Sequence, residues 1–182
     1  MNLYDLDPGK DSPEVVTCVI EVPRNSTNKY EYDPERELFF LDRVLYSAMH
    51  YPGDYGFIPG TLAEDGDPVD VLVLTNYPSF PGIVLRARPL AFLEMSDEKG
   101  RDQKVLAVPV DDPRYDSNRH ISTISPHRLR EIEHFFDIYK ELEGKKVQVE
   151  DWHGIEETHA MIEEARETYL AAHAQEDGSA AG

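Results

Sequence analysis

The sequence predicts an α+β fold that is mainly β, in which short strands form a barrel and two helices follow. Runs rich in β-branched residues recur at short intervals between residues 15 and 110, separated by Gly, Pro, Asn and Asp. After residue 125 the apolar residues recur at helical spacing instead. The 182 residues suit one domain spanning residues 1–182 with a sizeable core, and no linker divides them.

The first strand is expected at residues 15–22, where Val-Val-Thr-Cys-Val-Ile-Glu-Val ends at Pro23. Further β-prone runs cover residues 37–44, 69–74, 83–93, 104–110 and 147–150. Closely spaced short strands of this kind are typical of a barrel. Residues 50–60 are rich in Pro, Gly and aromatic residues, and we expect a rigid loop there.

Two helices are expected in the last third of the chain. Ser125 caps the first and Pro126 occupies its first turn, and apolar residues then recur as far as Gly144, at Leu129, Ile132, Phe136 and Tyr139. The second helix is expected at about 155–170, with an apolar stripe on one side and glutamates on the other. Residues 171–182 are small and polar and are expected to form a disordered tail, which leaves a core of about 13–170.

The charge balance disfavours nucleic-acid binding. Eighteen Lys and Arg against 36 Asp and Glu give a net charge of −18, which repels a phosphate backbone. Cys18 is the only cysteine, which excludes an intrachain disulfide framework and fits a cytoplasmic location. We find no apolar run long enough to span a membrane and no secretion signal. The acid excess also fits a surface adapted to high salt, in which case activity would rise with molar KCl.

The densest chemical signal is an acidic segment that precedes a strongly apolar strand. Asp65, Asp67 and Asp70 fall within six residues, and alternate positions of an extended chain share one face. Carboxylates held this close raise one another's pKa, and a divalent cation removes that cost. Oxygen ligands without a supporting Cys or His set favour Mg²⁺ or Mn²⁺ over zinc.

Two other interpretations of this acidic segment are an EF-hand calcium loop and a solvated turn. An EF-hand calcium loop starting at Asp65 needs Gly at its sixth position and Glu at its twelfth, but Asp70 and Asn76 stand there, and Pro68 is its fourth residue. A solvated acidic turn is the simpler alternative in so acidic a chain, and the segment alone leaves it open.

A second acidic segment and several scarce cations favour the metal-site interpretation. A barrel can bring Asp97 and Asp102 opposite the first cluster, which gives more aspartates than one Mg²⁺ needs and implies several metals. Basic residues lie in or near the motifs that surround these segments, at Lys29, Arg43, Lys104 and Lys140. Metals and cations together suit a compact oxyanion such as a phosphate ester or anhydride.

Signatures of other catalytic classes are absent from the sequence. We find no Ser nucleophile elbow, Walker A loop, dinucleotide-binding glycine motif or His-Glu-x-x-His zinc motif. Tyr55, in the aromatic loop, has a hydroxyl that can donate to a substrate oxygen, although such loops more often serve packing. Covalent acyl chemistry and P-loop nucleotide hydrolysis are therefore poorly supported.

Five motifs in order resemble the soluble family I inorganic pyrophosphatases of the short prokaryotic type. The central motif is Asp65-Gly-Asp-Pro-Val-Asp70-Val-Leu. The others are Asn28-Lys-Tyr-Glu31, Tyr51-Pro-Gly-Asp-Tyr55-Gly-Phe-Ile-Pro59, Asp97-Glu-Lys-Gly-Arg-Asp102-Gln-Lys104 and Tyr139-Lys-Glu-Leu-Glu143. The resemblance spans about residues 13–170 and implies a five-stranded OB-like β-barrel flanked by two α-helices.

The resemblance also implies a reaction and a set of roles. It implies Mg²⁺-dependent hydrolysis of inorganic pyrophosphate to two orthophosphates by direct attack of a metal-activated water, without a covalent intermediate. Asp67 would be the general base, and the metal ligands would be Asp65, Asp70, Asp97 and Asp102. Substrate would be bound by Lys29, Arg43, Tyr55, Lys104, Tyr139 and Lys140, while Glu21 and Glu31 would line the cavity through metal-bound water.

Further expectations concern metals, assembly and rival functions. Mn²⁺ would substitute for Mg²⁺, and Ca²⁺ would inhibit because its larger radius and looser coordination activate water poorly. Resemblance and chain length imply a homohexamer, with the helix that bears His127 and His134 as the candidate interface. The rival functions are a catalytically inactive OB-like binding module and a metal-dependent phosphohydrolase acting on nucleotides or sugar phosphates.

Overall fold

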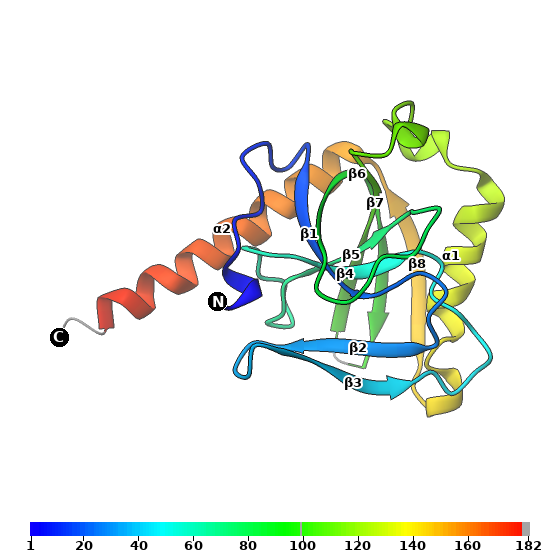
Figure 1. Cartoon of the computed structure of the whole chain (residues 1–182), viewed down its shortest axis with the longest axis horizontal. Coiled ribbons are helices and arrows are strands. Elements are labelled where there is room, and N and C mark those ends of the chain that lie inside the picture. Colours follow the sequence, from blue (N-terminus) through cyan, green and yellow to red (C-terminus); the bar gives the residue numbers. More distant parts are fainter. Residues whose placement is uncertain (99, 180–182) are drawn as a thin grey trace.

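In the computed structural model, which describes residues 1–98 and 100–179, five strands form a ring closed by hydrogen bonds. They are β1 (Val16–Val22), β4 (Asp54–Ile58), β5 (Val69–Val73), β7 (Gly100–Pro109) and β6 (Val84–Asp97), and β6 also pairs with β1. This ring and the two helices confirm the predicted mainly β fold (Figure 1). No helix among the described residues is both long enough and apolar enough to cross a membrane.

The register of the ring places acidic and basic residues of distant segments side by side. β5 and β7 are parallel, with Asp70 opposite Lys104, whereas β6 and β7 form an antiparallel hairpin with Met95 opposite Asp102. Asp97 pairs with Gly100 at the end of that hairpin. Sequence segments centred on residues 70, 97 and 104 therefore meet at one end of the ring.

A separate hairpin lies beside this end of the ring. It consists of β2 (Asn28–Asp33) and β3 (Leu38–Val44), which pair with each other and not with the larger sheet. In Figure 1 it crosses below the strands of the ring. The remaining strand, β8 (Val147–His153), pairs with residues 92–97 of β6, the half of β6 that leads into the β6–β7 hairpin.

The two helices are associated with different clusters of core residues. α1 (Pro126–Ile138) places Ile132 and Phe136 against one cluster, which includes Leu72 and Leu106. Residues that alternate with these along β5 and β7 belong to a second cluster, which Ile162 of α2 (Ile155–Ser179) joins. The strands are therefore apolar on both faces, which is why they read as continuous hydrophobic runs.

The structure corrects several boundaries predicted from the sequence. Residues 50–60 contain the fully buried strand β4 instead of only a loop, and β2 was not predicted as a strand. β4 is hard to recognise because Gly56 lies in it, yet a Cβ there would stand 1.9 Å from the Val19 carbonyl oxygen of β1. The close approach of the two strands therefore requires glycine.

The helix ends also differ from those predicted. α1 ends at Ile138, and a separate 3-10 turn at Glu141–Glu143 leads to Gly144, whose φ of 73° ends the segment. α2 continues through Ser179, beyond the expected end at Leu170, so the described part of the expected tail is helical. Residues 180–182 lie outside the described residues.

Candidate active site

A cavity of about 560 Å³ lies between the end of the ring and the β2–β3 hairpin. Every residue that the sequence predicted for the site lines it. These are Glu21, Lys29, Glu31, Arg43, Tyr55, Asp65, Asp67, Asp70, Asp97, Asp102, Lys104, Tyr139 and Lys140. The structure therefore brings together residues from the ring, the hairpin, the β4–β5 connection and the segment after α1.

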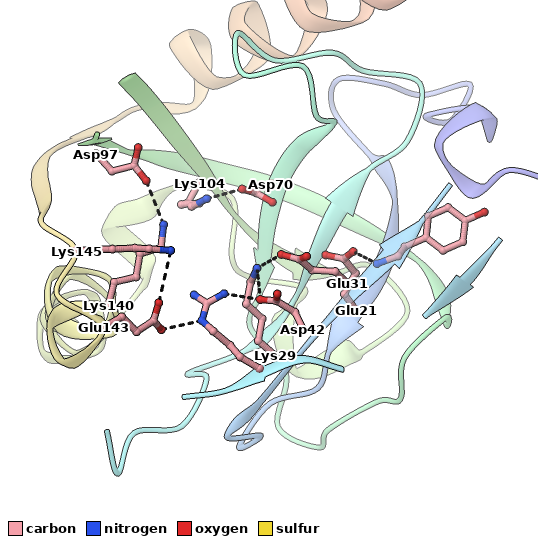
Figure 2. Close-up of polar contacts among 12 residues, drawn as sticks. Glu21, Lys29, Glu31, Asp42, Asp70, Asp97, Lys104, Lys140, Glu143 and Lys145 are labelled. Atoms are coloured by element: carbon pink, nitrogen blue, oxygen red, sulfur yellow. Dashed lines mark hydrogen bonds and ion pairs between the residues drawn. The ribbon is translucent and has the colours of Figure 1, made fainter. Parts of the chain in front are cut away.

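Lys104 provides the main positive charge on the ring side of the cavity (Figure 2). It is 5 % exposed, and its ammonium group forms an ion pair with Asp70 and another, at 2.8 Å, with Asp102. Burial lowers the pKa of Lys104, but the surrounding groups, Asp70 foremost, outweigh that effect and hold the pKa well above its ordinary value. Lys104 therefore stays charged at neutral pH despite its burial.

A second ion pair brings the segment after α1 to the end of the β6–β7 hairpin. Lys140 Nζ donates to Asp97 Oδ2 at 3.1 Å, and both side chains are about 15 % exposed. Burial lowers the pKa of Lys140, whereas Tyr139 and Asp97 raise it, and the net shift is upward. Asp97 and Asp102, which follow one another across the hairpin turn, are thus each paired with a different lysine.

The β2–β3 hairpin presents two more cations, each held by carboxylates. Lys29 forms ion pairs with Glu31 and, at 3.4 Å, with Asp42. Arg43 pairs with Asp42, and its Nε donates to Glu143 Oε1 at 2.7 Å. Burial opposes ionisation of Asp42, but Lys29 and Arg43 bring its pKa below the ordinary value. Figure 2 shows the contacts of Lys29 with Glu31 and Asp42 together with those of Lys104 and Lys140.

The acidic segment between β4 and β5 adopts a turn, which corrects the prediction that it is an extended strand. Asp65 Oδ1 accepts a hydrogen bond from the Asp67 backbone N–H at 3.1 Å, and Gly66 between them has a φ of 91°. Both aspartates line the cavity because of this local turn, and not because alternate residues of a strand share a face. Gly66 is favoured there because its φ lies in the left-handed region.

Two buried side chains form the inner part of the cavity. Glu21 is 8 % exposed, and burial raises its pKa to about 8, although its Oε1 accepts the Tyr32 backbone N–H at 2.8 Å. Tyr55 is 7 % exposed, and burial holds its pKa well above the ordinary value. Its hydroxyl therefore remains a hydrogen-bond donor at neutral pH.

The donor set of the cavity suits a hard divalent cation. Its potential ligands are carboxylate oxygens, and the chain's cysteine, Cys18, is buried in the core. Among residues 1–98 and 100–179, no three acidic, His or Cys side chains surround one point closely enough to hold a metal ion. Lys104 pairs with Asp70 and Asp102 instead, so its ammonium group supplies the positive charge between those carboxylates.

Sequence reasoning did not assign several other residues that line the cavity, among them Tyr4, Asp42, Glu98, Arg101 and Lys145. Tyr4 and Lys145 carry no signal in the sequence, because they reach the cavity only through the fold. Glu98 and Arg101 lie inside a recognised motif and Asp42 adjoins the predicted site residue Arg43, so their neighbours could have pointed to them. The Glu143 carboxylate, on the last residue of one motif, orients Arg43.

Comparisons with known proteins agree on one family. The family model described as inorganic pyrophosphatase matches residues 18–170. The chain belongs to the inorganic pyrophosphatase family. An inorganic pyrophosphatase of Nostoc sp. is 48 % identical over 162 residues, which cover 89 % of this chain and 96 % of the relative. That of Methanosarcina acetivorans is 50 % identical over 157 residues, covering 86 % and 94 %.

Solved inorganic pyrophosphatase structures share the fold. The crystal structure of the Thermus thermophilus inorganic pyrophosphatase matches with a TM-score of 0.92 and 48 % identity, covering 93 % of this chain and 99 % of that one. The family and the enzyme class predicted from the sequence, an inorganic diphosphatase, are therefore confirmed. The OB-like binding module without activity is correspondingly disfavoured.

Proposed function

We propose that this protein hydrolyses inorganic pyrophosphate to two orthophosphates with Mg²⁺ as cofactor and without a covalent intermediate. One observation carries the proposal: carboxylates and cations from separate segments meet in a single cavity of an acidic chain. Pyrophosphate is a compact, highly charged anion that needs both, cations for its oxygens and metal ligands for the ions that accompany it. Membership of the inorganic pyrophosphatase family supports this substrate.

The acidic residues divide into metal-holding and supporting groups. Asp65, Asp70, Asp97 and Asp102 would hold several Mg²⁺ ions, with Glu21 and Glu31 as outer partners. When bound, these ions neutralise phosphate charge and lower the pKa of water from about 15.7 toward neutrality. Asp70 and Asp102 also pair with Lys104, so this lysine would lie beside the metal-holding carboxylates, where its ammonium group would bind a phosphate oxygen.

The chain's own groups perform the proton transfer and bind the substrate. Asp67 accepts the proton of the water that attacks phosphorus in line with the leaving phosphate. Lys29 and Arg43 on the hairpin hold phosphate oxygens on one side of the cavity, while Lys104 and Lys140 hold them on the other. The pairing of each cation with carboxylates directs it toward the cavity before substrate arrives, which lowers the reorganisation needed in the reaction.

Two tyrosines complete the phosphate site. Tyr55 stays protonated and donates a hydrogen bond near the attacked phosphate, and Tyr139 stands beside Lys140 with the lysine 5.2 Å from its ring centre. These groups stabilise charge that develops on the departing phosphate in a partly desolvated cavity.

Orthophosphate release by the purified protein tests the function. Fast release from pyrophosphate with Mg²⁺, abolished by EDTA and slower with Ca²⁺ in place of Mg²⁺, is the expected result. A panel of nucleotides and sugar phosphates under the same conditions tests substrate choice. Faster release from any of these than from pyrophosphate would contradict the proposal, as would full activity in EDTA.

The proposed assembly is a homohexamer in the cytoplasm, with α1 as part of the interface. His127 and His134 lie on this helix, and His127 forms an exposed pair with Glu131 at 3.6 Å. Sedimentation analysis should give six times the chain mass of 20.8 kDa. A monomer at micromolar concentration would contradict this assembly.

A further inference from the structure

A charged network lies on the side of the β6–β7 hairpin that faces away from the aspartates of the active-site cavity. Glu94 of β6 binds two partners, one with each carboxylate oxygen. Its Oε1 accepts from Arg101 Nε at 2.6 Å, and its Oε2 lies 2.7 Å from His153 Nε2. The strands alternate, so Glu94 and Arg101 lie on the faces opposite to Asp97 and Asp102.

His153 holds its end of this network rigidly. Its ring stacks on Phe92 with centroids 4.4 Å apart and planes at 10°, and its Nδ1 lies 3.7 Å from Glu157 of α2. Its side chain is 27 % exposed, whereas that of Glu94 is 18 % exposed. The hydrogen bond from His153 is the largest of the effects that hold the pKa of Glu94 below its ordinary value. Glu94 is therefore an anion with little freedom to move.

Arg101 is the member of the network that reaches the active site. It lines the active-site cavity together with Glu98 and Asp102. It also lines a second cavity of about 440 Å³ on the α2 side, together with Gln103, His153 and Glu157. The side chain is 48 % exposed, so Glu94 fixes its direction more than packing does. Because Glu94 engages Nε, the guanidinium group keeps a defined orientation while its terminal nitrogens are left for another partner.

We propose that Arg101 is an additional substrate-binding cation at the rim of the active-site cavity, and that Glu94 and His153 are the residues that position it. The inference rests on the proposed function, since it assigns Arg101 to binding the pyrophosphate. A cation at the mouth of an anion-binding cavity raises the rate of capture and the affinity more than the rate of the chemical step. Arg101 thus acts on KM, whereas Asp67 acts on kcat.

The test measures orthophosphate release from pyrophosphate with Mg²⁺ for wild type and Arg101→Gln. The expected result is a rise in KM of about three- to tenfold with kcat within about twofold, as for an exposed charge at the rim of a cavity. In 0.5 M KCl the ratio of the two KM values should fall toward one, because salt screens the charge. An unchanged KM would overturn the proposal. So would a fall in kcat that accompanies a fall in melting temperature and does not change with salt concentration.

A matched control separates this effect from a change in net charge. Arg86 lies at the other end of β6, is exposed and pairs with Asp111 at 2.8 Å. Arg86→Gln changes the charge of the protein equally but should leave KM and its salt dependence at the wild-type values. A KM rise of the same size in both variants would mean that overall charge, and not the position of Arg101, governs capture.

The role of Glu94 is tested by non-additivity. Glu94→Gln should raise KM in the wild-type background, because Arg101 loses its fixed direction, but should add nothing in the Arg101→Gln background. A lower KM in Glu94→Gln, or additive effects, would contradict positioning by Glu94. If Arg101→Gln fails to fold, Arg101→Lys serves instead, since it keeps the charge and should give an intermediate KM. Absence of turnover in folded wild type would reject the proposed function, whereas normal wild-type turnover with an unaffected variant rejects this inference alone.

Discussion

The ring of strands and the β2–β3 hairpin form two sides of the same cavity but are held in place differently. In the ring, every residue of β4 is buried, and β1 and β5 have only one partly exposed residue each. In β2 and β3 together, Tyr32 is the single buried residue, and its ring packs at a tilt against Phe39 and the ring-strand residue Phe57. The ring therefore supplies stability and fixed carboxylates, whereas the hairpin supplies Lys29 and Arg43 with little core of its own.

Truncating one apolar residue in the ring and one in the hairpin tests whether the two are stabilised differently. The truncation in the ring should cost the most stability. Leu93 in β6 is completely buried, so Leu93→Ala should lower the free energy of unfolding by about 3 kcal/mol. Leu41 in β3 is 54 % exposed, so Leu41→Ala should cost less than about 0.5 kcal/mol. Urea denaturation of both variants measures the difference. Equal losses would mean that the hairpin belongs to the same cooperative core as the ring.

Replacing Lys104 should lower the free energy of unfolding somewhat less than Leu93→Ala does. Lys104→Met leaves Asp70 and Asp102 without their shared counter-charge, which should lower the stability of metal-free protein by about 2 kcal/mol. Because a divalent cation can take the place of that charge, Mg²⁺ should raise the melting temperature of the variant more than that of wild type. The comparison is made by thermal denaturation with EDTA and with Mg²⁺. A variant as stable as wild type in EDTA would show that the aspartates do not need a counter-charge.

The remaining prediction concerns the pH dependence of stability and Glu21. Burial raises the pKa of Glu21 in the folded protein to about 8, whereas the ordinary value is 4.5. The folded state then holds a proton that the unfolded state releases, so metal-free protein should lose stability as pH rises from about 4.5 to about 8. Glu21→Gln removes this contribution and should be more stable than wild type at pH 8.5 but not at pH 4. Parallel stability curves for the two proteins in EDTA would contradict the raised pKa.

Sequence reasoning located the site better than it located the strands around it. The motifs assign Asp65, Asp70 and Asp102 to one predicted site, and all three line the cavity, because clustered carboxylates before an apolar strand are a local pattern. The strand prediction missed β4, because Gly56, Pro52 and Pro59 give this segment the composition of a loop. Its pairing with β1 is a long-range contact that local sequence does not reveal. Sequence reasoning also assumed that Asp65 and Asp67 share a strand face, whereas a turn at Gly66 brings both to the cavity.

The pairing of the cations could not be predicted in this way. Arg43 and Glu143 are separated by 100 positions in the chain, and only the packing of the segment after α1 against the hairpin brings them to 2.7 Å. The network of Glu94, Arg101 and His153 likewise joins three strands and gives no motif. Composition and local spacing indicate which residue types serve a phosphate site, but the partners that orient them depend on tertiary contacts.

The central claim is that Asp67 accepts a proton during Mg²⁺-dependent hydrolysis of pyrophosphate in this cavity. The most direct test is the rate of orthophosphate release by Asp67→Asn, measured at saturating pyrophosphate together with Mg²⁺ binding by calorimetry. Loss of a general base predicts a fall in kcat of about 100-fold or more, with Mg²⁺ affinity within about threefold of wild type. Near-normal kcat in this variant, with the protein folded and Mg²⁺ bound, would contradict the claim.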